Sequence, residues 1–192
     1  MDEQNNSRRL RKKNNTHKAL LHSAKKLFED KGIGNVTIDE ISEAADVSRS
    51  TFFTHFASLD DLLEQIANEE ISDLAAVWQD SDVSFSITAL MDKLVEDTIP
   101  YPYLTGELLM RGILSKGESS SFNEIYNLAE ERISTHYSYE KTLEYFTTEE
   151  ISALLLGSYF GFVFQRFIKN KPFDNDIELK QSINKFIAFL KK

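Results

Sequence analysis

The sequence predicts an all-α protein. Apolar residues recur three or four positions apart along most of the 192 residues, which is the spacing of one face of an α-helix. No segment keeps the apolar–polar alternation of a strand. Seven glycines and three prolines are few for the repeated turns of a β-sandwich or barrel. Together these observations favour a chain of about nine helices.

The first helix is predicted over about residues 16–31. Leu20 and Phe28 lie on one face of it, at helical spacing. Thr16 is a suitable N-cap residue, and Gly32 can take the left-handed conformation that follows a helix. The helix therefore has a predicted start, a buried face and a predicted end.

Two short helices are predicted next. Thr37 precedes the first of them, with Glu40 three residues later as a capping-box partner. This helix stops near Asp46, a residue type that tolerates positive φ. Ser48 caps a third helix over about residues 49–55. Two short helices separated by three or four residues form the helix-turn-helix layout.

The rest of the chain also reads as helical. Further helices are predicted over residues 60–78, 86–99, 103–114, 121–136, 148–170 and 176–191. Residues 153–168 are apolar nearly all round, with Arg166 as the single charge. A helix of this kind is buried on all sides. One side can pack on its own bundle, and the other needs a partner.

The net charge of −9 is unevenly distributed. Residues 1–60 carry ten Lys or Arg and nine Asp or Glu, whereas the remainder carries twelve and twenty-two. Between Ser7 and Phe28 there are eight basic residues and no acidic one. A concentrated basic strip is typical of contact with nucleic acid, and the acidic remainder repels it.

Several classes of protein are disfavoured by what the sequence lacks. It has no cysteine, which excludes disulfides and thiolate sites and suits a reducing compartment. The polar start predicts no signal peptide, and no run of about twenty apolar residues predicts a membrane span. We therefore expect a cytoplasmic protein without membrane contact.

Catalysis is also not expected. The four histidines are scattered, and none follows a glutamate by three positions. No glycine-rich phosphate loop and no nucleophile elbow is present. We expect no catalytic residue, no metal and no cofactor. A membrane-surface protein that uses its basic first helix is a further alternative, which the acidic remainder disfavours.

A longer motif surrounds the two short helices. Residues 37–56 read T-I-D-E-I-S-E-A-A-D-V-S-R-S-T-F-F-T-H-F, followed by A-S-L-D-D-L-L. Over about residues 14–66 the chain resembles the DNA-binding domain of TetR-family repressors, whose pattern is roughly T-V-x-x-I-A-x-x-A-G-V-S-x-G-T-L-Y-x-H-F-x-x-K-x-x-L. The residues in register are Thr37, Ile41, Ala45, Val47, Ser48, Thr51, His55, Phe56, Leu62 and Leu63.

The resemblance implies a DNA-binding domain over residues 1–60, consisting of a basic arm and a helix-turn-helix. Residues 61–192 then form a helical ligand-binding and dimerisation domain. The chain departs from the family pattern at three positions: the usual Gly is Ser50, the usual Tyr is Phe53 and the usual Lys is Leu59. The last two changes remove phosphate partners. An alternative is therefore a degenerate member that acts mainly through protein contacts, with weak or no specific DNA binding.

Residues in the first turn of a recognition helix enter the major groove. Arg49, Ser50 and Thr54 are candidates for base edges, and Arg49 can make a bidentate contact with guanine. The first five of the predicted DNA contacts form the arm, which follows the backbone or reaches into the minor groove. The full set is Arg8, Arg9, Arg11, Lys12, Lys13, Thr37, Ser48, Arg49, Ser50, Thr51, Phe53, Thr54 and His55. Capping alone is the alternative for Thr37 and Ser48, and a structural role is the alternative for His55. For the arm, Arg8 to Lys13, the alternative is an unstructured solvated tail.

The resemblance also implies a homodimer, formed by the last two helices of each copy. Gly157 and Gly161 would permit close helix approach. The two recognition helices then reach successive major grooves about 34 Å apart, so the operator is palindromic. The expected interface residues are Leu154, Gly157, Ser158, Gly161, Phe164, Ile183, Phe186 and Ile187. A large monomeric core helix is the alternative.

Aromatic and thioether side chains between these regions are candidates for the lining of an effector pocket. They are Trp78, Phe85, Met91, Tyr103, Met110, Phe122 and Tyr126. Cavities between the helices of a bundle are lined mostly by apolar groups. We expect a small apolar or aromatic effector that releases a repressor from its operator. Plain core packing is the alternative for each residue.

Overall fold

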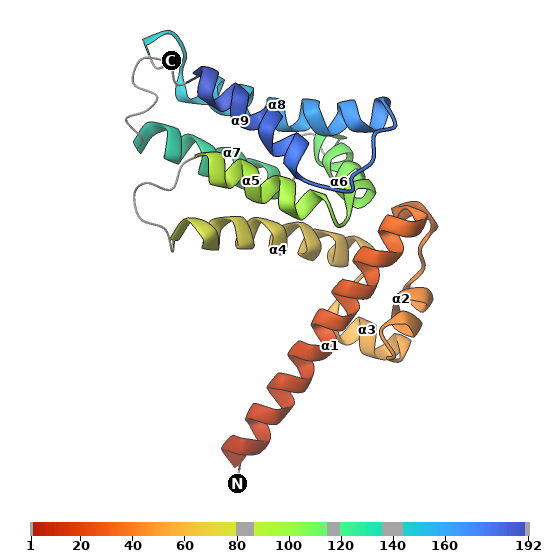
Figure 1. The fold of residues 1–192 in the computed structure, drawn as a ribbon. Helices are drawn as coiled ribbons and strands as arrows, with labels where there is room; N and C mark the ends of the chain where they lie inside the picture. Colours follow the sequence, from red (N-terminus) through yellow and green to blue (C-terminus); the bar gives the residue numbers. More distant parts are fainter. Residues whose placement is uncertain (1, 80–86, 115–119, 136–143, 191–192) are drawn as a thin grey trace. The chain divides into compact units, whose positions relative to one another are not determined.

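A computed structural model describes residues 2–79, 87–114, 120–135 and 144–190 (Figure 1). These residues form nine α-helices, one short 3-10 helix and no strand, which confirms the all-α prediction for the described part of the chain. The chain divides into two compact units, residues 1–67 and 68–192. The division falls within α4 (Leu59–Gln79), whereas the sequence placed a domain boundary after residue 60.

Helix α1 (Asp2–Lys31) begins much earlier than predicted. Thr16 lies in the helix interior and is not its N-cap, so the predicted start was wrong. The reason is that residues 1–31 contain no Gly or Pro to interrupt a helix. The end was predicted correctly: Gly32 has a φ of 78° and donates its N–H to the carbonyl of Phe28 at 2.8 Å.

The predicted basic arm is therefore helical. Arg8, Arg9, Arg11, Lys12 and Lys13 lie along α1 with exposed side chains. A helix with its side chains is about 10–12 Å wide, whereas the minor groove is about 6 Å wide. A helical arm fits the expectation that these residues follow the phosphate backbone better than the expectation that they reach into the minor groove. Contacts from these side chains to phosphates stay a prediction.

The first unit continues with two short helices and the turn between them. The elements after α1 are η1 (Ile33–Asn35), α2 (Ile38–Ala44) and α3 (Arg49–His55). Thr37 and Glu40 form the predicted capping box of α2, and Asp46 in the turn has a φ of 53°. Ser48 caps α3 by accepting a hydrogen bond from the Thr51 N–H at 3.2 Å. The helix-turn-helix prediction is confirmed.

The second unit is a bundle. After the C-terminal part of α4 it contains α5 (Ile87–Thr98), α6 (Pro102–Leu114), α7 (Ser120–Thr135), α8 (Thr148–Ile168) and α9 (Ile177–Leu190). Helix α8 packs against α7 and α9, and α5 packs against α9. The buried core of this bundle includes Leu90, Met91, Val95, Ile133, Ile151, Leu155, Val163, Ile183 and Ile187.

Helix α8 is long and apolar enough to cross a membrane, judged by length and composition alone. The core helix of a bundle passes the same test. Here Ile151, Leu155 and Val163 pack in the bundle core. The guanidinium of Arg166 is buried as well and donates a hydrogen bond to Glu178 at 2.9 Å. We therefore interpret α8 as a bundle helix that packs one face in the core.

Candidate nucleic-acid interface

Helix α3 packs on buried aromatic side chains. Phe52 and Phe56 are fully buried. The ring of His17 on α1 stacks on Phe56 with 4.8 Å between centroids and an interplanar angle of 23°. Because α3 has seven residues and too few hydrogen bonds to be stable alone, this packing holds it in place.

The opposite face of α3 is exposed. It presents Arg49, Ser50, Phe53 and Thr54 to solvent. Phe53 keeps 48% of its surface exposed, which is unusual for a large apolar side chain within a compact domain. The candidates for base contact therefore lie together on one accessible face of α3.

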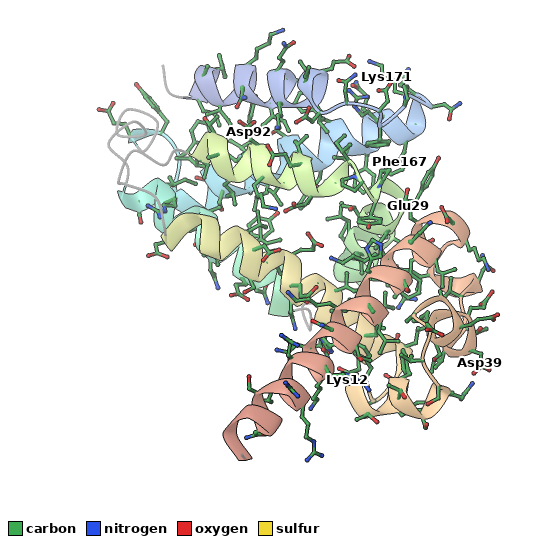
Figure 2. All side chains as sticks on the ribbon, turned by 60° about the horizontal axis from the view of Figure 1, so that its bottom comes forward. Lys12, Glu29, Asp39, Asp92, Phe167 and Lys171 are labelled. Carbon is green, nitrogen blue, oxygen red and sulfur yellow. The ribbon has the colours of Figure 1, made fainter. Side chains whose placement is uncertain are left out.

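Arg49 is held by two neighbours. Its Nη1 donates to Asp39 Oδ1 at 2.6 Å, and its guanidinium carbon lies 5.6 Å from the centroid of the Phe53 ring. Asp39 projects from α2 (Figure 2). From the sequence alone, Asp39 is a negative charge in the DNA-binding domain that opposes binding. Its pairing with Arg49 across ten residues depends on how α2 and α3 pack, which the sequence pattern does not reveal.

The hydroxyls of Thr37 and Ser48 are both engaged as caps. Thr37 Oγ1 donates to Glu40 Oε2 at 2.8 Å, and the Thr37 N–H donates to the same oxygen at 2.8 Å. Lys31 Nζ adds a hydrogen bond to Glu40 Oε1 at 2.7 Å. The hydrogen bond from Lys31 and those from Thr37 lower the pKa of Glu40 to about 2. The capping role predicted for Thr37 and Ser48 is thus observed, and their contact with phosphate stays a prediction.

Three further candidates make contacts within the domain. Thr51 Oγ1 lies 2.8 Å from Ser48 Oγ, and Thr54 Oγ1 donates to the Ser50 carbonyl at 3.1 Å. His55 is half-buried, and its ring lies 5.6 Å from that of His17. Burial lowers the pKa of His55, and the charges of His17 and Lys13 act in the same direction. These contacts are consistent with the structural alternative for His55.

The basic side chains of α1 form an exposed strip. Arg8, Arg9, Arg11 and Lys13 are exposed, and Lys12 projects from the N-terminal half of the helix in Figure 2. At about 3.6 residues per turn, these five charges spread over more than half of the helix circumference, so several of them can face a phosphate backbone at once.

The exposed face of α8 carries most of the predicted dimer residues. Leu154 is 40% exposed, Gly157 and Gly161 are exposed, and Ser158 and Phe164 are half-buried. An added Cβ at either glycine would meet no heavy atom within 4 Å, so the space above them is open. An open depression of about 460 Å³ lies here, lined by Ala153, Leu154, Gly157, Ser158, Gly161, Phe162, Gln165 and Phe186.

Two of the predicted dimer residues point elsewhere. Ile183 and Ile187 are 0% and 2% exposed and belong to the core of their own bundle. Their assignment to the interface is corrected, because the apolar stripe of α9 is already buried against α5 and α8 of the same bundle. Phe186 is half-buried and lines the depression.

The four predicted pocket residues whose side chains the structure describes are not brought together in one cavity. Met91 is buried in the core, Tyr126 packs against that core, and Tyr103 and Met110 are 59% and 45% exposed. For Met91 the plain core alternative therefore holds, and the exposure of Tyr103 and Met110 does not fit an enclosed cavity. Phe85 and the side chains of Trp78 and Phe122 lie outside the described residues.

A polar cluster in the bundle was not predicted from the sequence. The hydroxyls of Thr98 on α5 and Tyr159 on α8 lie 2.5 Å apart, and burial raises the pKa of Tyr159 to about 12. Beside them, burial raises the pKa of Asp97, which accepts a hydrogen bond from Lys93. The hydrogen bond between Thr98 and Tyr159 joins α5 to α8 inside the bundle. Within the described residues, no group of three or more His, Cys, Asp or Glu is placed to hold a metal ion.

Fold and site together define a helix-turn-helix protein with a C-terminal helical bundle. Residues 20–66 match the family model of bacterial regulatory proteins of the tetR family. No curated protein matches the chain in sequence. The chain thus carries the N-terminal domain of the TetR family, and it has the fold of a TetR-family transcriptional regulator.

Solved structures share this fold over nearly the whole chain. A transcriptional regulator from Aquifex aeolicus VF5 is 19% identical, with a TM-score of 0.69, and the match covers 91% of this chain and 99% of that one. The fatty acid degradation regulator FadR from Bacillus halodurans is 15% identical, with a TM-score of 0.70 and coverage of 88% and 92%. Thermus thermophilus FadR, a TetR-family repressor in complex with lauroyl-CoA, is 19% identical, with a TM-score of 0.55 and coverage of 91% and 92%.

Proposed function

We propose that this protein is a cytoplasmic transcriptional regulator that binds DNA sequence-specifically, as a repressor, through α3. The observation that carries the proposal is the exposed face of α3, which presents Arg49, Ser50 and Thr54. The opposite face of the same helix is fixed by buried aromatic rings. A helix held in this way can enter a major groove without losing its own packing. Arg49 then has the chemistry to select guanine.

The exposed basic strip of α1 supplies contacts to phosphate. Arg8, Arg9, Arg11, Lys12 and Lys13 carry five positive charges in six positions. Each phosphate that they neutralise adds about 0.9 to the slope of log affinity against log salt. Binding to the operator is therefore strongly salt-dependent, although the whole chain carries a net charge of −9.

A homodimer formed through α8 and α9 accounts for the exposed apolar face of the bundle. Leu154 and Phe162 flank the open depression above Gly157 and Gly161. An apolar surface of this kind on a soluble protein marks an interface. The two copies are related by a two-fold axis, so their recognition helices read the two halves of a palindromic operator.

Release from the operator is assigned to a small apolar or aromatic effector that binds the bundle. The support is the fold shared with Thermus thermophilus FadR, which was solved in complex with lauroyl-CoA. An effector releases the repressor if it binds better to a dimer whose recognition helices no longer fit successive grooves.

The test is binding of the full-length protein to DNA from upstream of its own gene, in a gel shift at low salt. We expect a preference over an unrelated fragment, which Arg49→Ala reduces about 5- to 150-fold, the worth of one bidentate contact. Lys169→Ala removes the same charge from an exposed site beyond α8 and serves as the control. The absence of any preference would contradict the proposal and favour the alternative of a degenerate member that acts through protein contacts.

A further inference from the structure

We propose that Arg49, Phe53 and Asp39 read a guanine and a nearby thymine in each half-site. Arg49 bonds the guanine, Phe53 contacts the thymine methyl group, and Asp39 positions Arg49. This inference rests on the proposed DNA-binding function, and it adds which bases are read and by which residues.

The guanidinium of Arg49 is fixed on two sides while its remaining donors stay accessible. Asp39 Oδ1 accepts from Nη1 at 2.6 Å, and the Phe53 ring lies against the guanidinium at 5.6 Å. Arginine has five N–H donors, so Nη2 and Nε remain available for the O6 and N7 of guanine. The Arg49 side chain is 56% exposed, which leaves room for a base. Because the side chain is already ordered, binding costs it less conformational entropy.

Phe53 provides an apolar contact at the same place. One side of its ring meets the buried Phe52 edge-to-face, with centroids 5.5 Å apart and an interplanar angle of 84°. Its exposed half stands beside Arg49, four residues earlier on α3. In the major groove, the apolar group that a phenylalanine can contact is the C5 methyl of thymine.

The spacing limits where the thymine lies. The guanidinium carbon of Arg49 and the centroid of Phe53 are 5.6 Å apart. Successive base pairs are about 3.4 Å apart, and two steps span about 6.8 Å. The thymine is therefore expected one or two base pairs from the guanine.

The role of Asp39 can be separated from simple repulsion. A carboxylate near DNA repels phosphates of every sequence alike, so its removal strengthens binding to all sites by the same factor. A carboxylate that positions Arg49 instead affects the discrimination between guanine and other bases. The two roles are distinguished by the ratio of two dissociation constants, one for a site with guanine and one for the same site with another base. The affinity for a single site does not distinguish them.

The first experiment tests Phe53. The full-length protein selects its sites from a random duplex library at fixed salt, and each enriched thymine is then replaced by deoxyuridine, which removes only the methyl group. We expect about fourfold weaker binding per lost methyl for the wild type, the value for burial of one such group, and no loss for Phe53→Ala. An equal loss in both proteins would overturn the role of Phe53. Phe53→Ala is expected to fold because the side chain of Phe53 is half exposed.

The second experiment tests Asp39. The dissociation constant for each selected site is measured, and so is that for the same site with adenine in place of the enriched guanine. The ratio of the second constant to the first measures the preference for guanine. Asp39→Ala is expected to lower this ratio at least about fivefold, the lower bound for one bidentate contact. Glu43→Ala removes the same charge from an exposed position of α2 and should leave the ratio unchanged. If both variants only tighten binding to both sites, the positioning role is wrong.

The selection experiment also distinguishes a failure of this inference from a failure of the proposed sequence-specific DNA binding on which it rests. If no sequence is enriched, the proposed sequence-specific function fails and the inference fails with it. If sequences are enriched without a guanine that depends on Arg49 and a thymine that depends on Phe53, the inference alone fails.

Discussion

The two compact units differ in where they leave apolar side chains exposed. Among the described residues of the first unit, the exposed large apolar side chains are Leu10 and Phe53, which lie on separate helices. The second unit exposes many more, and one of them, Leu154 on α8, lines the open depression that also includes Gly157 and Gly161. The first unit therefore has a closed core and exposes two separate large apolar side chains among its described residues. The second has an exposed apolar face on α8, which we propose to be covered by a second copy of the chain.

The largest expected effect tests whether the core of the first unit is as closed as this comparison states. Phe52→Ala should lower the free energy of unfolding of this unit by about 3–5 kcal/mol, because the side chain is fully buried. Phe53→Ala, one residue further along α3, should lower it by only about 1 kcal/mol, because half of the ring is exposed and the other half packs on Phe52.

The two variants are compared by urea unfolding of the full-length protein. Circular dichroism follows both units, whereas fluorescence of the single tryptophan, Trp78, follows the second. Similar losses for the two variants would show that the exposed ring is as much a part of the core as the buried one.

The next effect tests the open face of the second unit. Gly161→Glu places a charge where the protomer leaves open space, so the protomer should fold. In a dimer the same carboxylate would be buried without a partner. We expect the dimer to dissociate at least tenfold more readily, which corresponds to about 1.4 kcal/mol.

Sedimentation equilibrium at micromolar concentration measures this change. Asn127→Glu, at an exposed position of α7, adds the same charge and should not alter the association. A wild-type protein that sediments as a monomer would show that the face of α8 has another purpose.

The first unit could be predicted in detail because its signals are local. A cap, a capping box and a residue with positive φ each depend on a few neighbouring residues, as at Thr37, Asp46 and Ser48. The start of α1 failed for a related reason. Thr16 has the right type for a cap, but helix propensity across the preceding residues decides whether a helix actually begins there.

The site and the bundle could be predicted only in outline. Periodicity shows that α9 has an apolar stripe, but tertiary packing decides that Ile183 faces the core while Phe186 lines the outer depression. The pair formed by Asp39 and Arg49 is likewise set by the packing of α2 on α3. Contacts with DNA remain predictions, because they depend on a partner.

The smallest expected effect concerns the capping box, a helix-start motif that occurs in both units. Thr37 and Glu40 form a capping box at α2, and Thr147 and Glu150 form one at α8. The box of the first unit is also tied to the end of α1, because Lys31 donates to Glu40 at 2.7 Å. This added bond is the largest cause of the lowered pKa of Glu40, which falls from 4.5 to about 2.

The sign of the resulting pH dependence follows from this shift. A carboxyl whose pKa is lower in the folded state stabilises the fold above its unfolded pKa. The contribution of Glu40 is therefore complete above about pH 4.5 and is lost as the pH falls toward 2. An NMR titration of the Glu40 carboxyl carbon should show a pKa near 2, and Lys31→Ala should raise it toward 4.5. Lys26→Ala removes a charge from an exposed position of the same helix and should leave it unchanged. If Lys31→Ala does not move the titration, the tie between α1 and α2 is not formed in solution, and the two boxes are equivalent.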